Sequence, residues 1–495
     1  MILRAAAALL IIAMAALLVL SSLHKPLSYD EYDNLAYGYR FLTQGPGADP
    51  IGQRMPVLAL NALPCLAGGC REQGIDASEV ELLKVRATSM VFALALAAVA
   101  WRWAAALYGP VGGLVALGLT ALNPNLLAHG KQVGSDVAVS FFMAAAAYQG
   151  WRLFRRGGGR RAFVWCTLAT AGALLSKMTG VLLFPAFAIL LAREVTLRRI
   201  RPARALVGAA GFAAGVLLLL NAGYGFKGSL HTARDYNWRS ATFEKLPRVP
   251  LPLLLPRVYV QQLDYSSYLQ DHPDVARGRN YVLGRLNSEG TWYAVPVMLL
   301  LKNPLALFVL LALAARARGE NDDAWSLLPP ALLVIAFFSL FARPQLGIRY
   351  VLPALPFLIV YASRIALRWT LPRPPLTHLA LLAWYAGSTL SYHPHYMSYF
   401  NELIGPRVNA YRFLADSNLD WEDRRYFVDR FRERHPEIPF VLNPATPQTG
   451  WVVVGANDLV GIFDEERYRW LREGFRPVRH VAYSYLLFYV ERVPR

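Results

Sequence analysis

The sequence predicts a polytopic α-helical membrane protein that carries a small α/β domain at its C-terminal end. Of the 495 residues, 55% are hydrophobic and 17% are charged, which is below the roughly 25% of charged residues in typical soluble proteins. The formal net charge is +18, but the basic residues gather in short clusters between apolar runs. That distribution is typical of a membrane protein and argues against nucleic-acid binding.

Apolar runs close to the roughly 20 residues that cross a bilayer recur along the chain. The first could belong to a signal peptide, because one Arg precedes it and small residues follow, but its length favours a retained first helix. The fifth and sixth are short and separated only by Lys177, so they can form one broken hairpin. We expect about eleven membrane segments, at approximately residues 5–23, 87–107, 110–128, 135–153, 162–176, 178–192, 205–224, 292–314, 325–342, 347–363 and 376–391.

Four basic clusters assign the two sides of this membrane module, residues 1–391. With the N-terminus inside, the alternating segments bring all four to the cytoplasmic side, in agreement with the positive-inside rule. We therefore expect a multi-pass inner-membrane protein. The clusters are Arg152, Arg155, Arg156, Arg160 and Arg161; Arg193, Arg198, Arg199, Arg201 and Arg204; Arg316 and Arg318; and Arg364, Arg368 and Arg373.

Three polar segments, 24–85, 225–291 and 392–495, fall on the opposite side. The last is long enough for a small domain. It holds the strand-like runs WVVVGAN and YSYLLFYVERV, with the helix-like ERYRWLREGF between them, which favours an α/β domain. Cys65 and Cys70 lie in the first outer loop, where a disulfide is chemically permitted, although two unpaired small residues are an equal alternative. Cys166 lies in a membrane segment, where we expect it only to pack.

Acidic residues follow the first helix in SYDEYDNLAYGYRF, at Asp30, Glu31 and Asp33. Carboxylates so near a membrane surface are costly to desolvate, which suggests a general base for an acceptor hydroxyl or a metal ligand. A solvated acidic loop that caps a helix is the alternative. Asp136, in HGKQVGSDVAVSFF, follows His129 and Lys131; an N-cap at Ser135 or Asp136 explains it as well.

Isolated cations stand at the outer edge of four apolar runs. They are Arg86, Lys177, Lys302 and Arg349. Any one of them can be a side chain that snorkels to the interface. Four on one side, opposite acidic loops, suggest instead a site for an anion within reach of lipid, and a phosphate at the membrane boundary fits.

An ordered set of motifs resembles the GT-C glycosyltransferases. The set is SYDEYDNLAYGYRFL, RATSMVFAL, NPNLLAHGKQVGSDVAVSFFM, LLSKMTGVLLFP and LGIRYVLPALPF. Within that superfamily it is most similar to the protein O-mannosyltransferase-like and aminoarabinose-transferase-like enzymes. The segment HPHYMSYFNELIGPRVNAYRFLADSNLDWEDRRYF is similar to one in a bacterial branch. The resemblance covers nearly the whole chain, whereas residues 225–291 resemble nothing that we can assign.

The resemblance implies a transferase that takes a sugar from a polyprenyl-phosphate carrier in the bacterial inner membrane, with its site and C-terminal domain in the periplasm. It assigns the catalytic carboxylate to Asp30, with Glu31 beside it, and a second acid to Asp136. The cations that it places near the carrier phosphate are Arg86, Lys177 and Arg349, and, more weakly, Lys131, His129 and Lys302. No cofactor is certain; a divalent metal ion on Asp30 and Glu31 stays an alternative.

The chemistry that this inventory supports is inverting transfer to an acceptor hydroxyl. A lipid phosphate is already a good leaving group, so it needs cations to stabilise developing charge more than an acid to protonate it. A lipid or glycan transporter is one alternative, although we find no paired inverted repeats. A non-catalytic envelope scaffold on the same fold is the other. The sequence predicts neither the donor sugar nor the acceptor, which can be a protein, a lipid or a glycan.

Overall fold

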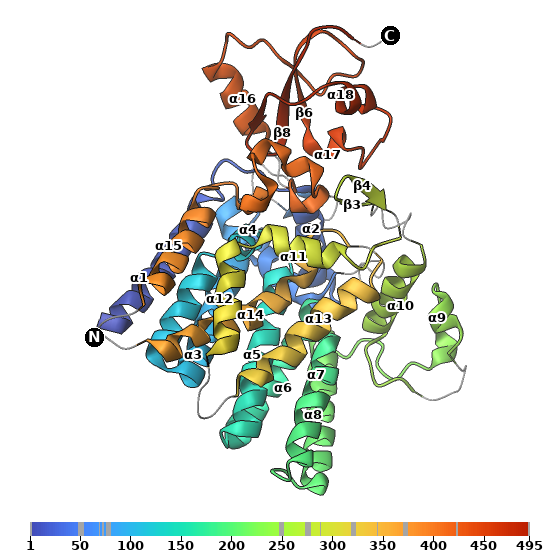
Figure 1. Ribbon diagram of the computed structural model, residues 1–495. Coiled ribbons are helices and arrows are strands. Elements are labelled where there is room, and N and C mark those ends of the chain that lie inside the picture. Colours follow the sequence, from blue (N-terminus) through green and yellow to red (C-terminus); the bar gives the residue numbers. More distant parts are fainter. Residues whose placement is uncertain are drawn as a thin grey trace.

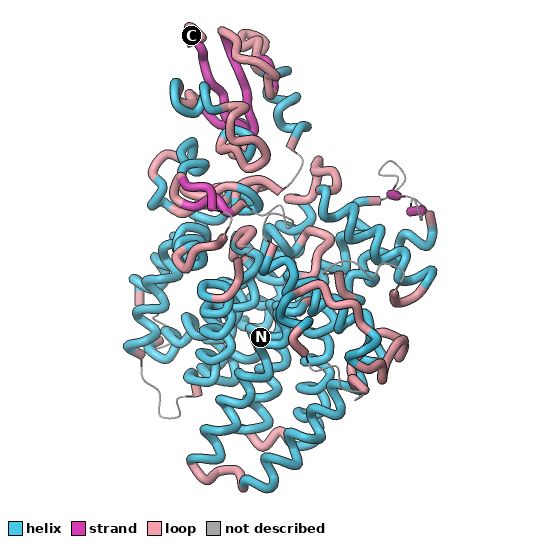
Figure 2. Tube along the Cα trace, turned by 90° about the vertical axis from the view of Figure 1, so that its right-hand side faces the viewer, coloured by secondary structure: helices cyan, strands magenta, loops and turns pink. Residues whose placement is uncertain are grey.

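The computed structural model shows a helical module with a small sheet region at one end (Figure 1). This arrangement confirms the predicted fold class. Figure 2 shows the same division from the side, with the longest strands standing beyond the ends of the helices. The structure describes residues 2–47, 54–68, 70–71, 74–75, 81–246, 252–272, 279–287, 289–317, 323–343, 345–369, 375–421 and 424–493.

Each apolar run of the sequence contains helix in the structure. The helices of the module are α1 (Ile2–Leu20), α3 (Leu82–Ala121), α5 (Asp136–Arg155), α6 (Gly159–Ser176), α7 (Leu183–Thr196), α8 (Pro202–Gly223), α11 (Ala294–Lys302), α12 (Leu305–Arg316), α13 (Leu328–Leu340), α14 (Leu355–Ala362) and α15 (Leu376–Leu390). Over the described residues, five helices are long and apolar enough to cross a membrane, or six if the bent pair α11–α12 is one span. The number of about eleven segments stays a prediction.

Two breaks explain why runs and helices do not correspond one to one. Helix α3 contains Gly109 with φ of 79°, followed by Pro110, at the predicted boundary between two segments. Glycine adopts positive φ at little cost and proline suits the start of the next helix. Helices α11 and α12 meet at an angle of 101°, so the eighth predicted segment is sharply bent.

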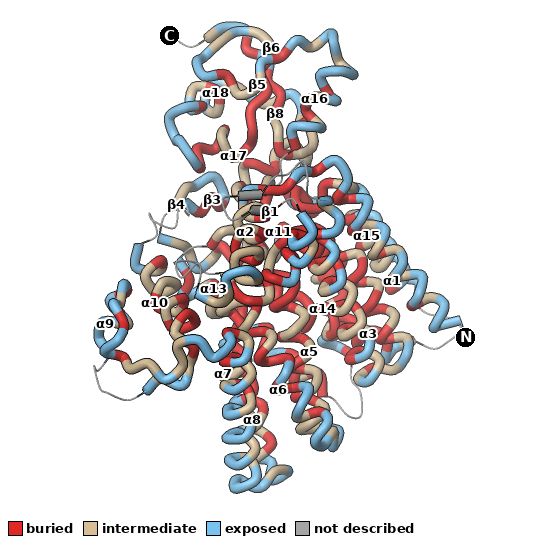
Figure 3. The backbone as a smooth tube through the Cα atoms, turned by 180° about the vertical axis from the view of Figure 1, so that it is seen from behind, coloured by how far each residue is buried: buried red, intermediate tan, exposed pale blue. Residues whose placement is uncertain are grey.

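The surface of the module is apolar where lipid would contact it. Leu9 and Ile12 on α1, and Leu206 and Val207 on α8, are between 64% and 74% exposed. Figure 3 shows buried residues concentrated in the middle of the module and exposed ones along α8. A large apolar surface outside a buried helical core is typical of a protein that spans a bilayer.

The basic clusters meet at the end of the module away from the sheet. An Arg155 Nη atom lies 2.7 Å from the Asp323 carboxylate and the other 3.6 Å from that of Glu194, and Glu194 also pairs with Arg199. Arg368 donates to the carbonyl of Arg316. These contacts link the first cluster to the second and the third to the fourth; residues 318 and 373 lie outside the described residues.

Shorter elements connect the membrane helices. The helical ones are α2 (Tyr29–Gln44), η1 (Pro56–Ala67), α4 (Pro124–Gly130), η2 (Met178–Leu182), η3 (Ala233–Asp235), α9 (Ala241–Glu244), α10 (Arg257–Asp271), η4 (Ala324–Leu327), η5 (Ile348–Ala354) and η6 (Ser363–Arg368). Two antiparallel hairpins are β1 (Cys70–Arg71) with β2 (Gly74–Ile75), and β3 (Asn280–Val282) with β4 (Arg285–Asn287). A disulfide joins Cys65 to Cys70.

The C-terminal region, residues 391–493, contains a four-stranded sheet of order β5-β6-β8-β7. Strand β5 is parallel to β6 and the other pairs are antiparallel. Alternate residues face opposite sides, so Val452 and Val454 belong to one apolar cluster while Val453 packs with α16 in another. The elements are η7 (Tyr396–Ser398), η8 (Glu402–Ile404), η9 (Arg407–Arg412), η10 (Asp416–Asn418), α16 (Arg425–Arg434), β5 (Val441–Leu442), β6 (Gly450–Gly455), α17 (Ala456–Leu459), α18 (Arg469–Gly474), β7 (Arg479–Val481) and β8 (Tyr485–Val490).

Candidate functional site

The first outer loop places Asp30 and Glu31 in the first turn of α2. Ser28 is the N-cap residue, and its side chain and that of Glu31 form a reciprocal capping box, which fixes where the helix begins. Adjacent helical residues point in different directions. Asp30 keeps 38% of its side chain exposed, whereas Glu31 is buried.

Glu31 and Arg86 form a buried pair whose members are each 3% exposed. The Arg86 guanidinium donates to both Glu31 oxygens at 2.9 Å. The same two oxygens accept the backbone N–H groups of Ser28 and Val133 at 2.9 and 3.0 Å. Arg86 also donates to the carbonyls of Lys25 and Pro26, each at 2.9 Å. This pair therefore anchors residues 22–31 to α3.

Arg349 is the cation next to Asp30. Its Nη1 atom lies 3.1 Å from Asp30 Oδ2, and its Nε atom donates to the carbonyl of Leu346. The guanidinium lies over the Trp421 ring at 4.1 Å from the centroid, a geometry that favours a cation on an aromatic face. One carboxylate, one carbonyl and one ring thus hold the Arg349 side chain in place.

The turn that carries Arg349 binds the segment Asp416–Asn418. Ser417 Oγ donates to the Leu346 carbonyl at 2.7 Å, and Asn418 Oδ1 accepts the Ile348 N–H at 2.9 Å. Gly347, with φ of 86°, lies against Ser417 so closely that a Cβ atom there would collide with its Oγ. This close packing of Gly347 against Ser417 places Asp416 near Arg349.

Asp416 is a site carboxylate that the sequence reasoning did not single out. Its backbone has φ of 56°, a conformation that Asp tolerates better than most residues. Burial raises the pKa of the Asp416 carboxyl, with Asp30 adding to the rise and Arg349 opposing it. The signal was the run ADSNLDW, which the family resemblance contained without assigning its first acid a role.

Asp136 joins the same cluster from α5. Its Oδ1 atom accepts a bond from Lys177 Nζ at 2.5 Å, and Arg349 also interacts with the Asp136 charge. Ser135 is the N-cap residue of α5, without a side-chain cap bond. Lys177 has extended backbone between α6 and η2, at the predicted break, and its Nζ lies 4.8 Å from the Tyr350 ring centre.

The three remaining predicted cations have different surroundings. His129 is buried, and neither ring nitrogen has a hydrogen-bond partner within the described part of the chain; its ring lies 5.9 Å from that of Trp421. Lys302 is buried and donates to the carbonyls of Met397 and Asn418, so it fastens the C-terminal region to α11. Lys131 is buried as well.

Hydrogen bonds occupy both oxygens of Glu31, one of the two side chains considered for a metal ion. Both Glu31 oxygens already accept two N–H bonds each, and Asp30 faces Arg349. Among the described residues no three His, Cys, Asp or Glu side chains are grouped to hold a metal. The structure brings together instead three carboxylates, Asp30, Asp136 and Asp416, around Arg349 and Lys177.

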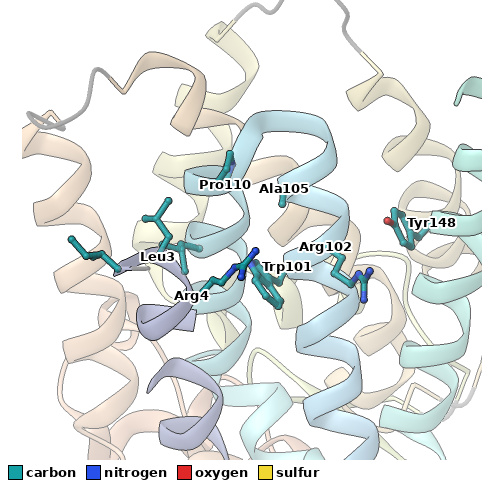
Figure 4. A pocket seen from close by; sticks show the side chains of 9 residues that line it. Leu3, Arg4, Trp101, Arg102, Ala105, Pro110 and Tyr148 are labelled. Carbon is teal, nitrogen blue, oxygen red and sulfur yellow. The ribbon is translucent and has the colours of Figure 1, made fainter. Parts of the chain in front are cut away.

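A separate cavity of about 850 Å³ lies near the start of α1. Figure 4 shows Arg4, Trp101, Arg102 and Tyr148 among the side chains that line it. Asp30 follows the other end of α1, so this cavity lies at the far end of the module. It has no part in the cluster around Arg349.

Comparisons with known proteins match part of the chain to one family and the fold to solved structures. Residues 78–219, from just before α3 into α8, match the model of the dolichyl-phosphate-mannose-protein mannosyltransferase family. The crystal structure of ArnT from Cupriavidus metallidurans in the apo state matches with a TM-score of 0.52 at 13% identity, over 97% of each chain. ArnT from the same organism bound to undecaprenyl phosphate matches with a TM-score of 0.47 at 12% identity, also over 97% of each chain. No curated protein sequence matches significantly.

The family match and the match to the apo ArnT structure confirm the resemblance to the GT-C superfamily of glycosyltransferases. The chain is a multi-pass membrane protein with the GT-C fold. Its family match contains Arg86, His129, Lys131, Asp136 and Lys177. Asp30, Arg349 and Asp416 lie outside the matched residues, and only the three-dimensional structure unites them with the rest.

Proposed function

We propose that this chain transfers a sugar from a polyprenyl-phosphate donor to an acceptor hydroxyl, with inversion and with Asp30 as the general base. One observation carries the proposal: at one end of the helical module, the partly exposed Asp30 carboxylate pairs with Arg349, and Lys177 pairs with Asp136 in the same cluster. The family match to a polyprenyl-type mannosyltransferase supports the donor class.

The reaction requires one proton transfer and one displaced phosphate. The acceptor oxygen attacks the anomeric carbon and loses its proton to Asp30, while the bond from that carbon to the phosphate oxygen breaks. Arg349 and Lys177 stabilise the charge that develops on the departing phosphate. In the structure these cations pair with Asp30 and Asp136. Binding of the donor phosphate therefore draws Arg349 from Asp30 and frees the carboxylate to accept the proton.

The reaction takes place on the periplasmic side of a bacterial inner membrane. The four basic clusters share the end of the module opposite the candidate site, and basic loops stay in the cytoplasm. The C-terminal region lies at the same end as α2, the helix that carries Asp30 (Figure 1), and would form a periplasmic domain. A lipid-linked donor reaches the Arg349 cluster from the bilayer, and the acceptor is a protein, lipid or glycan.

The test is turnover of a panel of polyprenyl-phosphate sugars by purified protein and its Asp30→Asn variant. Loss of a general base lowers the rate by roughly 10²–10⁴-fold, so consumption of the donor should fall by that factor. Asp33→Asn is the matched control, because Asp33 lies in the same helix and pairs with Arg54 at 2.7 Å. Wild-type turnover by Asp30→Asn would refute the base assignment. Consumption of no donor by wild-type protein would favour the scaffold, and release of intact lipid-linked sugar across the membrane would favour the transporter.

A further inference from the structure

A second cleft, separate from the Arg349 cluster, lies between the C-terminal region and the loop after α1. Its volume is about 530 Å³. The described residues that line it include five histidines, three arginines and no Asp or Glu. The lining residues are His24, His393, Pro394, His395, Tyr426, Phe427, Arg430, Phe431, Arg434, His435, Arg479, His480, Val481, Ala482 and Tyr483.

Aromatic contacts hold the polar side chains of this cleft in fixed positions. His24 stacks on Tyr426 with ring centres 4.6 Å apart, and His480 stacks on Tyr483 at 4.5 Å. Arg479 lies over the Phe431 ring. A side chain held by ring stacking loses less conformational freedom when it binds a ligand, so its contacts contribute more to affinity.

Two of the cations lack an acidic partner. Arg430 pairs with Glu433 at 3.1 Å, and His435 with Glu437 at 2.8 Å. Neither Arg434 nor Arg479 has a carboxylate within salt-bridge distance among the residues that the structure describes. The cleft therefore keeps positive charge that neighbouring acids do not neutralise.

Two imidazoles of the cleft lie in surroundings that disfavour a positive charge on their rings. Burial lowers the pKa of His480, and the charges of Arg407 and Arg479 lower it further. Its Nδ1 atom is buried with no hydrogen-bond partner in the described structure. Burial and the nearby Lys25 likewise lower the pKa of His393. The cations of this cleft repel one another, and one buried nitrogen has no partner in the described structure. An anion bound here would reduce the repulsion and could accept a hydrogen bond from that nitrogen.

We propose that this cleft binds the phosphate group of a phosphorylated saccharide. Arginine forks match the geometry of phosphate oxygens, and imidazole nitrogens can donate to the same group. The Tyr426 ring, which is 38% exposed and stacked on His24, offers a surface on which the C–H face of a sugar ring can pack. The saccharide can be free in solution or linked through its phosphate to a lipid; the chemistry that the cleft recognises is the same.

The cleft adjoins the Arg349 cluster without being part of it. His24 lies six residues before Asp30, which limits the distance between their Cα atoms to about 20 Å, and Tyr426 lies five residues after Trp421, a limit of about 17 Å. Lys25 Nζ donates to the carbonyl of Pro394 at 2.6 Å, so the loop after α1 reaches both sites. The proposal concerns binding only and does not depend on the transfer reaction.

The test is the binding of glucose 1-phosphate to purified full-length protein by calorimetry, with glucose as the uncharged comparison. The same protein in nanodiscs with and without phosphatidic acid distinguishes a lipid phosphate from a free one. The informative variant is Arg434→Gln with Arg479→Gln, which removes both cations that lack acidic partners. Arg432→Gln is the control, since Arg432 lies on the same helix but pairs with Asp429. A second double variant, Asp30→Asn with Arg349→Gln, measures any binding at the Arg349 cluster.

We expect the double cleft variant to bind glucose 1-phosphate at least roughly tenfold more weakly, because bonds to charged groups contribute more than neutral ones. Arg432→Gln should bind as wild type does, and binding at the cleft should persist in the Asp30/Arg349 variant. If phosphatidic acid in the nanodisc competes with glucose 1-phosphate, and the double cleft variant loses this competition, the phosphate that the cleft binds belongs to a lipid. Equal binding of glucose and glucose 1-phosphate, no binding of either phosphate probe, or unchanged affinity in the double variant would each overturn the proposal.

Discussion

At the scale of single residues, the adjacent acids Asp30 and Glu31 have opposite roles. The two Glu31 oxygens accept four hydrogen bonds, two from Arg86 and two from backbone N–H groups, so Glu31 stabilises the loop. Asp30 pairs with Arg349 and stays accessible. A general base needs a carboxylate that the acceptor can reach, and only Asp30 of this pair meets that requirement.

Asp416 allows a prediction on pH at the same scale. Because its pKa is raised in the folded protein, the folded state holds the proton more tightly than the unfolded state. Stability should therefore fall as the pH rises above the ordinary Asp value of 3.8 toward the raised value, and the penalty persists above it. Asp416→Asn removes this charge, so we expect a higher apparent Tm at pH 7 and no difference near pH 3.5.

The measurement is thermal unfolding in detergent across that pH range, with Asp429→Asn as the control, since Asp429 lies on exposed α16 and pairs with Arg432. An Asp416→Asn protein less stable than wild type at pH 7 would show that the attraction to Arg349 outweighs burial. Turnover measured in parallel tells whether the Asp416 charge also serves the transfer reaction.

At the scale of elements, the buried Glu31–Arg86 pair joins the start of α2 to α3. Removal of one partner from a buried ion pair leaves an uncompensated charge and costs about 3–5 kcal/mol. Glu31→Gln should lower the free energy of unfolding by that amount, whereas Asp33→Asn, which breaks a partly exposed pair with Arg54, should cost about 1 kcal/mol or less. Denaturant titration in micelles measures both, and equal losses would contradict the anchoring role.

The same elements show which features of the structure can be predicted from the sequence. Apolar runs locate the helices, because a bilayer requires about 20 such residues, and Lys177 marks the break between α6 and η2. Composition also points to Asp30, Asp136, Lys177 and Arg349. It does not separate Asp30 from Glu31, because the difference depends on which side chain faces Arg86. Nor does it reveal that Lys302 binds carbonyls of the C-terminal region, since such contacts join residues about a hundred positions apart.

At the scale of the whole molecule, the C-terminal region completes the candidate site. Asn457, on α17 beside the sheet, accepts the Asp416 N–H at 2.8 Å through its Oδ1 atom and donates to the Asp420 carbonyl at 3.0 Å. One side chain thus clamps both ends of the turn that carries Asp416 and leads to Trp421. The sheet region therefore holds the turn that lies against Arg349, in addition to lining the second cleft.

This coupling predicts that Asn457→Ala reduces transfer without unfolding the protein. Release of the turn would shift Asp416 and the Trp421 ring under Arg349, and a displacement of about 1 Å in a catalytic site can cost roughly 10²-fold in rate. We expect turnover of the lipid-linked donor to fall by that order while the apparent Tm changes little. Asn409→Ala is the matched control, because the Asn409 side chain makes no hydrogen bond within the described residues. If both variants turned over like wild type, the C-terminal region would not position the site, and its role would reduce to the second cleft.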